Sequence, residues 1–295
     1  MFQIISDGSC DLSPEQLRAA GLEIVPFYIT LDGKHFRKEI IELAVAEFYD
    51  YCIRHPDCVP HTSMPSVQDY MLCFEPHLAS GRDILCYCIT EKFSGSLRSA
   101  SVARDLLQEK YPEREILVVD STSVTALQGL LLLELSRYAR EGHTLQETWQ
   151  RGEAIKRSAS IYFTIENLHY LAMGGRIGKL TSLAARGLGI RPLIRYGSGE
   201  LHPLGVSIGR RRSFTKVAEI VKKYITEQSI DPVHYAFALG WGYDREEAEP
   251  FFRMIHKLFL DLFGQLPDFV PIQIGATIGV HTGPYPVGIA FIEKA

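Results

Sequence analysis

The stretch from Asp83 to Ala100, DILCYCITEKFSGSLRSA, constrains the fold of this chain more than any other. It begins with an unbroken apolar run, Ile84 to Ile89, of the kind that forms a strand covered on both faces. A polar turn then leads through Ser94-Gly95-Ser96 into a predicted helix over Leu97 to Lys110. A strand that ends at such a turn presents free backbone N–H groups and hydroxyls at the positive end of a helix. The turn therefore suits a phosphate or carboxylate, unless Ser94 or Ser96 is simply the N-cap of the helix.

The first half of the chain alternates predicted strands and helices with short connections. This alternation predicts an α/β fold in which a mainly parallel sheet is covered by helices on both faces. Ligands of such sheets lie beyond the carboxyl ends of the strands, where we expect Ser6-Asp7, Ser94-Gly95 and Asp120-Ser121 to cluster. The predicted strands are Phe2 to Ile5, Leu22 to Leu31, Ile84 to Ile89 and Ile116 to Val119, and the predicted helices are Pro14 to about Gly21, Ile41 to Arg54, Val67 to Ser80, Leu97 to Lys110, Thr125 to Arg140 and Leu145 to Ser158.

The second half has a different pattern, and we place a domain boundary near Ser158. A hairpin around Gly197-Ser198-Gly199-Glu200, segregated helices and two closing strands predict an α+β domain with a mixed or antiparallel sheet. We therefore expect an N-terminal α/β domain over residues 1–158 and a C-terminal α+β domain over residues 159–295. The predicted strands are Ile161 to Ile165, Pro192 to Tyr196, Leu201 to Ile208, Tyr235 to Leu239, Val270 to Gly275 and Gly288 to Ile292, and the predicted helices are Leu168 to Met173, Leu183 to Leu188, Phe214 to Thr226 and Arg245 to Phe263.

Length and composition argue against several classes of function. With 295 residues, 46% of them hydrophobic and 22% charged, the chain resembles an ordinary globular protein with material for two cores. A net charge of −4 and the lack of an aromatic-basic motif argue against nucleic acid as a partner. We expect no signal peptide and no membrane-embedded segment, because no apolar stretch approaches the length of a span. The six cysteines show neither a C-x-x-C pair nor a zinc spacing, so we expect reduced thiols in a cytoplasm and no metal site.

Two motifs of the second half each have two interpretations. Met173 to Leu180, MGGRIGKL, resembles a phosphate-binding loop, but its glycines are too close together and a leucine follows the lysine. The pair Gly174-Gly175 either ends a helix or turns the chain so that Arg176 points into a cleft. The motif VHTGP, Val280 to Pro284, is predicted as a loop between two strands, where a lone His281 is either structural or functional.

Two further features are possible sites. The run Arg210-Arg211-Arg212 lies between the hairpin and the next predicted helix, and it is either a solvated face or a contact for a partner or a phosphate. A serine hydrolase would need a G-x-S-x-G elbow, and the sequence around Ser94 lacks it. The residues alone therefore provide no catalytic motif.

Six motifs taken together resemble the DegV family and occur in that family's order along nearly the whole chain. They are SDGSCDLS around Asp7 to Leu12, HTSMPS at His61 to Ser66, FSGSLRSA at Phe93 to Ala100, DSTS at Asp120 to Ser123, YLAMGGRI at Tyr170 to Ile177 and HTGP at His281 to Pro284. The resemblance implies a two-domain protein that binds a long-chain fatty acid, with no other cofactor, in a cleft between its domains. In FakB-like members, the carrier presents the fatty-acid carboxylate to a separate subunit of a bacterial fatty acid kinase, which makes acyl phosphate for phospholipid metabolism.

The resemblance also implies roles for single residues, none of them catalytic. The residues implied to bind the carboxylate from the first domain are Thr62, Ser63, Ser94 and Gly95. Those implied to contact the carboxylate or acyl phosphate from the second domain are Arg176, His281 and Thr282. The basic residues that match the family's kinase-facing positions are Arg210, Arg211 and Arg212.

The chain departs from the family pattern at three places. Met64, Ser96-Leu97 and Tyr285-Pro286 stand where the family commonly has Gln, Thr-Tyr and Gly-Ala. These differences would reshape the mouth of the pocket and the surface that a kinase contacts. Two other functions stay open: a stand-alone acyl or phosphoryl transferase or hydrolase, and a lipid sensor without a kinase partner. The lack of a nucleotide motif favours the carrier.

Overall fold

The computed structural model describes residues 1–56, 58, 60–184 and 189–295, which form two large sheets and one small one. The first large sheet has the strand order β2-β1-β6-β7, and all its neighbouring strands are parallel. The apolar run that forms β6 is buried along both faces, as its sequence predicts. The strands are β1 (Phe2–Asp7), β2 (Glu23–Val25), β6 (Asp83–Cys88) and β7 (Ile116–Asp120).

Helices cover both faces of this sheet because alternate side chains of each strand point to opposite sides. On β6, Ile84 and Cys86 pack into a core with α3 and α4, whereas Leu85 and Tyr87 pack into a core with α1, α5 and α6. The predicted α/β fold with a doubly covered, mainly parallel sheet is therefore confirmed. The helices are α1 (Pro14–Ala20), α3 (Val67–Ala79), α4 (Ser96–Lys110), α5 (Thr125–Arg140) and α6 (Leu145–Ile155).

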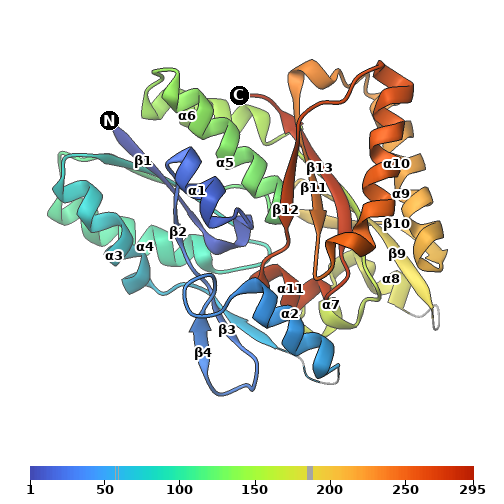
Figure 1. Ribbon diagram of the computed structural model, residues 1–295. Helices are drawn as coiled ribbons and strands as arrows, with labels where there is room; N and C mark the ends of the chain where they lie inside the picture. Colours follow the sequence, from blue (N-terminus) through green and yellow to red (C-terminus); the bar gives the residue numbers. More distant parts are fainter. Residues whose placement is uncertain (57, 59, 185–188) are drawn as a thin grey trace.

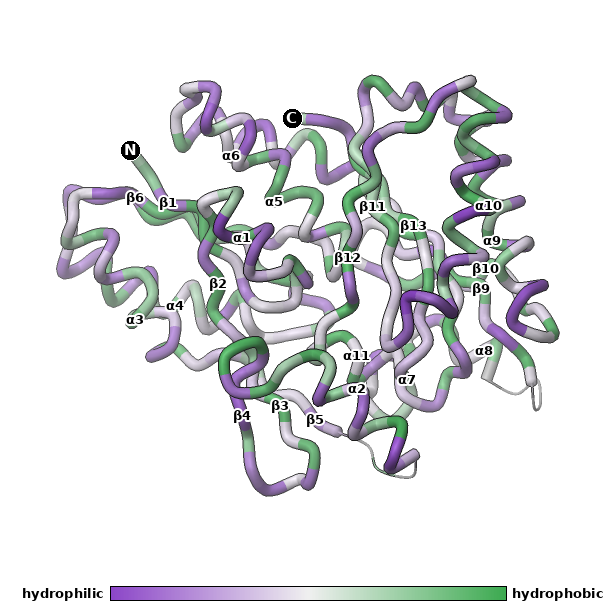
Figure 2. Tube along the Cα trace, viewed as in Figure 1, coloured by the Kyte–Doolittle hydropathy of each residue, from purple (hydrophilic) through white to green (hydrophobic). Residues whose placement is uncertain are grey.

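The second large sheet is mixed, with the order β10-β9-β8-β13-β11-β12. Its neighbouring strands are antiparallel except for the parallel pair β11 and β12, so the predicted mixed sheet is confirmed. Helices α9 and α10 pack on one face, and hydrophobic residues are interspersed with hydrophilic ones along α10, as expected of a helix buried on one side (Figure 2). The elements are β8 (Ser160–Thr164), β9 (Ile190–Gly197), β10 (Glu200–Ile208), β11 (Tyr235–Trp241), β12 (Phe269–Gln273), β13 (Val287–Glu293), α9 (Arg210–Glu227) and α10 (Arg245–Phe263).

Helix α5 lies between the two large sheets and contacts both of them (Figure 1). Its residues from Thr125 to Leu132 are all buried, which explains an apolar run without an amphipathic period. Gly129 permits this packing, since a Cβ there would lie 2.8 Å from the Cys10 carbonyl oxygen and 3.2 Å from Ile272 Cδ1. Cys10 and Ile272 belong to opposite halves of the chain, so one helix contributes to the packing of both.

The single strand predicted over Leu22 to Leu31 is wrong. The segment breaks after β2 at Pro26, which has no N–H for a ladder bond, and resumes as β3 in a small antiparallel sheet of order β4-β3-β5. The helix predicted from Ile41 begins at Val45 instead, because residues 40–43 form a turn in which the Ile40 N–H donates to the Leu43 carbonyl oxygen. The elements are β3 (Tyr28–Thr30), β4 (Phe36–Lys38), β5 (His61–Ser63) and α2 (Val45–Arg54).

Two motifs lie in elements other than those predicted. Arg210 to Arg212 form the first turn of α9 rather than a linker, and His281 lies in the short helix α11 (Ala276–Thr282) rather than in a loop. The many β-branched residues of α11 have weak helix propensity, so its helical form depends on tertiary packing. Helix α8 (Thr181–Ala184) contains the first two residues of the helix predicted over Leu183 to Leu188, and residues 185–188 lie outside the described residues. Within the described ranges, we find no helix whose length and hydropathy suit a membrane crossing.

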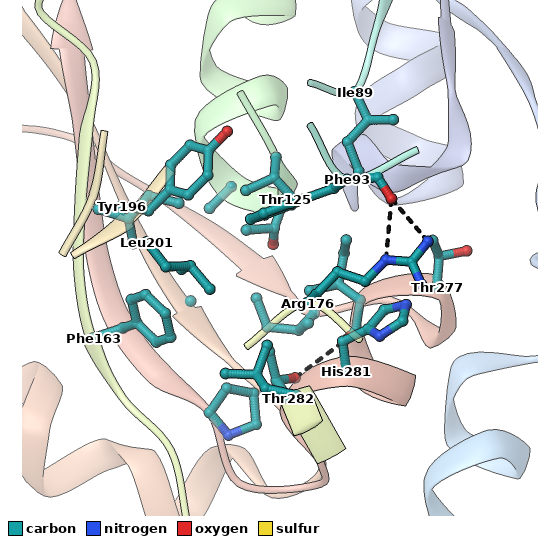
Figure 3. Close-up of a pocket in the computed structure, with 18 of the residues that line it drawn as sticks. Ile89, Phe93, Thr125, Phe163, Arg176, Tyr196, Leu201, Thr277, His281 and Thr282 are labelled. Carbon is teal, nitrogen blue, oxygen red and sulfur yellow. Dashed lines mark hydrogen bonds between the residues drawn. The ribbon is translucent and has the colours of Figure 1, made fainter. Parts of the chain in front are cut away.

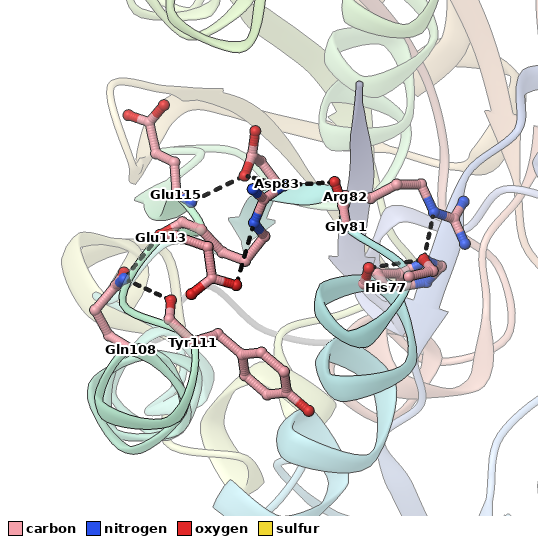
Figure 4. A network of polar contacts seen from close by, with 10 residues as sticks. His77, Gly81, Arg82, Asp83, Gln108, Tyr111, Glu113 and Glu115 are labelled. Carbon is pink, nitrogen blue, oxygen red and sulfur yellow. Dashed lines mark hydrogen bonds and ion pairs between the residues drawn. The ribbon is translucent and has the colours of Figure 1, made fainter.

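A polar network at the amino ends of β6 and β7 is structural (Figure 4). The Arg114 guanidinium donates to the Gly81 carbonyl oxygen, and Gln108 donates to the Arg114 carbonyl oxygen. The Glu115 N–H donates to the Asp83 carboxylate at 3.0 Å. These bonds attach the connection between α4 and β7 to the start of β6, at the sheet edge opposite to the predicted ligand edge.

Candidate ligand-binding site

A cavity of about 180 Å³ lies where the carboxyl edge of the first sheet meets the second sheet. This is the space that the centre of a water molecule can reach, and it exceeds by roughly tenfold what one water requires. Residues of both halves of the chain line it, and most of its wall is apolar. The apolar wall includes Ile89, Phe93, Val124, Ile161, Phe163, Leu171, Leu201, Ile274 and Ala290.

Most of the residues singled out in the sequence lie on this cavity. Thr62, Ser94, Gly95, Arg176, His281 and Thr282 line it, whereas Ser63 and Arg210 to Arg212 do not. Ser63 follows Thr62 on β5 and is exposed, because successive strand residues point to opposite faces. Arg210 is held by a bidentate ion pair with Glu247, so only Arg211 and Arg212 are exposed at the start of α9.

The predicted cluster at the carboxyl ends of the strands is confirmed. Asp7, at the end of β1, accepts a hydrogen bond from the Ile89 N–H at 2.9 Å, and the Ser121 N–H donates to the Cys88 carbonyl oxygen at 3.0 Å. These contacts bring the segments after β1, β6 and β7 together. Asp120 and Ser121 themselves do not line the cavity, but Val124 and the first two residues of α5, Thr125 and Ala126, do.

The Ser94-Gly95 turn offers unused donors at the start of α4. Gly95, not Ser94 or Ser96, is the N-cap, and no side chain caps the helix. Ser94 Oγ accepts the Ser96 N–H at 3.2 Å, which leaves the hydroxyl hydrogen of Ser94 available. The Gly95 N–H has no acceptor among the described residues, and the helix places partial positive charge beside it.

Arg176 reaches the cavity because of the glycine pair before it. The pair ends α7 (His169–Met173), and Gly175 adopts a φ of +69° that favours glycine. Both interpretations of this pair therefore apply. The Arg176 guanidinium donates to the Phe93 carbonyl oxygen from Nε at 3.1 Å and from Nη2 at 2.9 Å, across the two halves (Figure 3). Further guanidinium N–H groups remain for a ligand.

His281 is a neutral donor at the same end of the cavity. Burial lowers the pKa of His281 to about 4, and the nearby Arg176 and His61 act in the same direction. Its Nδ1 is buried without a partner, packed so tightly on Gly174 that a Cβ there would clash with the ring. A buried unpaired N–H costs more than an unpaired ring lone pair, so we assign the hydrogen to Nε2.

Three threonines of the wall use their hydroxyl hydrogens within the protein. Thr277 donates to the Glu39 carboxylate at 2.7 Å, Thr125 donates to the Asp11 carboxylate, and Thr282 donates to the Ile278 carbonyl oxygen at 3.2 Å. Thr282 is therefore a poorer candidate for a ligand donor than its place in the motif implies. Sequence reasoning missed Thr125, Thr277 and Glu39, because nothing in the sequence pairs residue 39 with residue 277.

The far end of the cavity is apolar. Phe163, Tyr196 and Leu201 lie there, on the side away from Arg176 and His281 (Figure 3). The Tyr196 hydroxyl is satisfied by the Thr122 carbonyl oxygen at 3.0 Å and adds no free polar group. In the described part of the chain we find no cluster of His, Cys, Asp and Glu side chains that could hold a metal. The site thus combines donors at one end with an apolar chamber at the other.

Comparison with known proteins identifies the family of this chain. The sequence pattern of a family described as uncharacterised DegV proteins matches residues 1–294. The chain belongs to the DegV family. A DegV domain-containing protein of Deinococcus radiodurans is 28% identical over 97% of this chain and 96% of the relative. One from Clostridium perfringens is 28% identical over 99% of each.

Solved DegV structures share the fold over the whole chain. A protein of Eubacterium ventriosum, described as binding stearic acid, is 34% identical with a TM-score of 0.94 and covers 100% of this chain and 99% of its own. A DegV protein of Thermus thermophilus, described by its fatty acid binding, is 22% identical with a TM-score of 0.84, at 99% coverage of both chains. The second likeness supports the fold alone, whereas the first extends to the sequence.

Proposed function

We propose that this DegV protein binds a long-chain fatty acid in the cavity, which we take to be a cleft between domains of residues 1–158 and 159–295. The observation that carries the proposal is the gathering of free donors at one end of an otherwise apolar chamber. The stearic acid-binding description of the Eubacterium ventriosum protein, 34% identical, supports the same ligand class. The donors proposed to hold the carboxylate are Thr62, Ser94, the Gly95 N–H, Arg176 and His281.

The energetics fit such a ligand. Each buried CH₂ is worth roughly 0.8 kcal/mol, so about fifteen of them supply on the order of 10 kcal/mol before the costs of association. A carboxylate without donors would cancel much of this gain. Several charge-assisted hydrogen bonds at one end are therefore needed to hold the head group.

Organic extraction of the purified protein, followed by mass spectrometry, tests the proposal. We expect a long-chain fatty acid in near-stoichiometric amount, or binding of added stearate or oleate to the emptied protein. If no fatty acid is extracted and none binds, the family membership describes the fold only, and the donor cluster would serve a smaller carboxylate or phosphate.

We further propose that the protein is not catalytic alone and presents the carboxylate to a separate kinase subunit, in a cytoplasm that supplies ATP. The exposed Gly95 and Met64, which is 44% exposed, line the carboxylate end, so a partner can approach the head group there. Arg211 and Arg212 are exposed and are the part of the arginine run that can contact such a partner.

Incubation with ATP, Mg²⁺ and oleate separates this proposal from its alternatives. We expect acyl phosphate only when a fatty acid kinase subunit is added, and we expect Arg211→Glu with Arg212→Glu to reduce its formation without changing oleate affinity. Acyl phosphate formed by the protein alone would instead identify a stand-alone transferase. A protein that binds oleate but yields no product with any kinase subunit would be a lipid sensor.

A further inference from the structure

We propose that Asp7 is a positioning residue for the Ser94-Gly95 turn, and that its carboxylate thereby sets how strongly the cavity prefers a carboxylate ligand. The inference rests on the proposed function, because it concerns the end of the cavity that would hold the fatty-acid head group. Asp7 does not line the cavity. It lies behind the wall at the carboxyl end of β1, with no exposed surface.

Both oxygens of the Asp7 carboxylate are fully used. Oδ2 accepts the Ile89 N–H at 2.9 Å and the Ser96 hydroxyl at 2.7 Å. Oδ1 accepts the Ser9 hydroxyl and the Gln128 side-chain amide, the latter at 3.0 Å. A carboxylate can accept all of these bonds at once, whereas a side-chain amide has a single oxygen.

The two donors on Oδ2 stand at the two ends of the ligand-binding turn. Ile89 directly precedes Thr90, whose carbonyl oxygen accepts the N–H groups of Phe93 and Ser94 at 3.0 and 3.3 Å. Ser96 is the first residue of α4 and directly follows Gly95. A single oxygen of Asp7 therefore fixes both the entry and the exit of the turn that carries the free donors.

The Ser96 hydroxyl extends this connection into the core. Its only hydrogen goes to Asp7, so the buried Tyr70 hydroxyl donates to Ser96 Oγ, at 2.6 Å. The start of α4 is thus held from the sheet by Asp7 and from α3 by Tyr70. The hydrogen bonds from Ser94 and Gly95 to a ligand carboxylate would depend steeply on distance and angle. A small shift of the first turn of α4 would therefore weaken them.

The expected consequence is specific to the head group of the ligand. In Asp7→Asn two of the four donors lose their acceptor, and the turn loosens around Ser94 and Gly95. An alkyl tail in the apolar chamber does not depend on this geometry. The variant should therefore lose affinity for a fatty acid and retain affinity for a fatty alcohol of the same length.

The test compares the Kd of stearate with that of octadecanol for the wild type, Asp7→Asn, Ser96→Ala and Ser136→Ala. Ser136 is a matched control, since it lies on α5 away from the cavity and its buried hydroxyl donates to the Ala20 carbonyl oxygen at the end of α1. We expect the preference for stearate to fall about tenfold in Asp7→Asn, the size of one charge-assisted hydrogen bond. The fall should be smaller in Ser96→Ala and absent in Ser136→Ala.

Each other outcome has a defined meaning. Equal losses of stearate and octadecanol affinity would show that Asp7 only maintains the fold, which overturns the inference. If Asp7→Asn lacks a cooperative unfolding transition, Ser96→Ala decides alone, and an unchanged preference there overturns it as well. If the wild type binds neither stearate nor octadecanol, the proposed function itself is refuted. If the wild type binds both ligands and the variants lose affinity for both equally, only the role of Asp7 is refuted.

Discussion

At the scale of residues, the chemistry of the cavity depends on which hydroxyl groups already donate a hydrogen bond within the protein. The Ser94 hydroxyl accepts the Ser96 N–H and donates to no described residue, whereas the Thr277 hydroxyl donates its hydrogen to Glu39. Both side chains line the same cavity. Their different capacity to bind a carboxylate follows from neighbours that are distant in sequence, not from the residue type.

Removing a free donor should weaken fatty-acid binding without unfolding the protein. We expect Ser94→Ala and Thr62→Ala each to raise the stearate Kd about tenfold, because each removes one hydrogen bond to a charged group. Ser63→Ala is the matched control, since Ser63 lies on the same strand but outside the cavity. Isothermal titration measures the affinities, and urea unfolding should stay within about 0.5 kcal/mol of the wild type. Unchanged affinity in both variants would remove these residues from the site.

Glu39 should make stability fall as the pH rises toward neutrality. Burial raises the pKa of Glu39 from 4.5 to about 7, although hydrogen bonds from Thr277 and Phe27 oppose the shift. Between these values the folded chain holds a proton that the unfolded chain has released, so the stabilisation present below pH 4.5 is lost as the pH rises through 7. The shift corresponds to about 3 kcal/mol.

Glu39→Gln stays uncharged at every pH and tests this linkage. We expect the free energy of unfolding, from urea titrations at pH 5 and pH 8, to differ less between the two pH values in the variant than in the wild type. The variant's absolute stability is not the readout, since the amide also loses an acceptor for Phe27 or Thr277. The same pH difference in both proteins would contradict the assignment.

At the scale of elements, α5 determines how the two large sheets meet. A substitution at Gly129 should act on both cores, because its Cβ would collide with the Cys10 carbonyl oxygen and approach Ile272. We expect Gly129→Ala to reduce the free energy of unfolding by about 1–3 kcal/mol, although alanine favours a helix. Arg140→Ala, at the exposed end of the same helix, should change it by about 0.5 kcal/mol or less. A neutral or stabilising Gly129→Ala would show that the helix moves aside without cost.

At the scale of the whole molecule, a ligand in the cavity contacts both halves of the chain and should stabilise them together. Stearate at about 100 times its Kd adds roughly 2.7 kcal/mol to the folded state, which corresponds to several degrees in Tm. Differential scanning calorimetry should show one transition that moves upward with stearate concentration, and decane of equal concentration should move it less. A midpoint independent of stearate would contradict binding at this site.

The sequence by itself determined much of the fold. The apolar run from Ile84 to Ile89, buried on both sides, and amphipathic helices such as Arg245 to Phe263 follow from local periodicity, which the structure retains. Because Asp7 and the Ser94-Gly95 turn each follow a predicted parallel strand, the sequence also predicted that they lie at the same edge of the sheet, as they do. The motifs that resemble the DegV family identified the polar residues around the cavity, whose roles stay predictions.

Only the tertiary structure decided the rest. The break at Pro26 into two sheets, the helix that carries His281, and the ion pair that withdraws Arg210 from solvent each depend on partners far along the chain. Hydrogen-bond partners that are far apart in sequence meet only after the sheets have packed, so no local pattern records them. For the same reason the sequence names the donors of the candidate site, but the structure decides which of them are free.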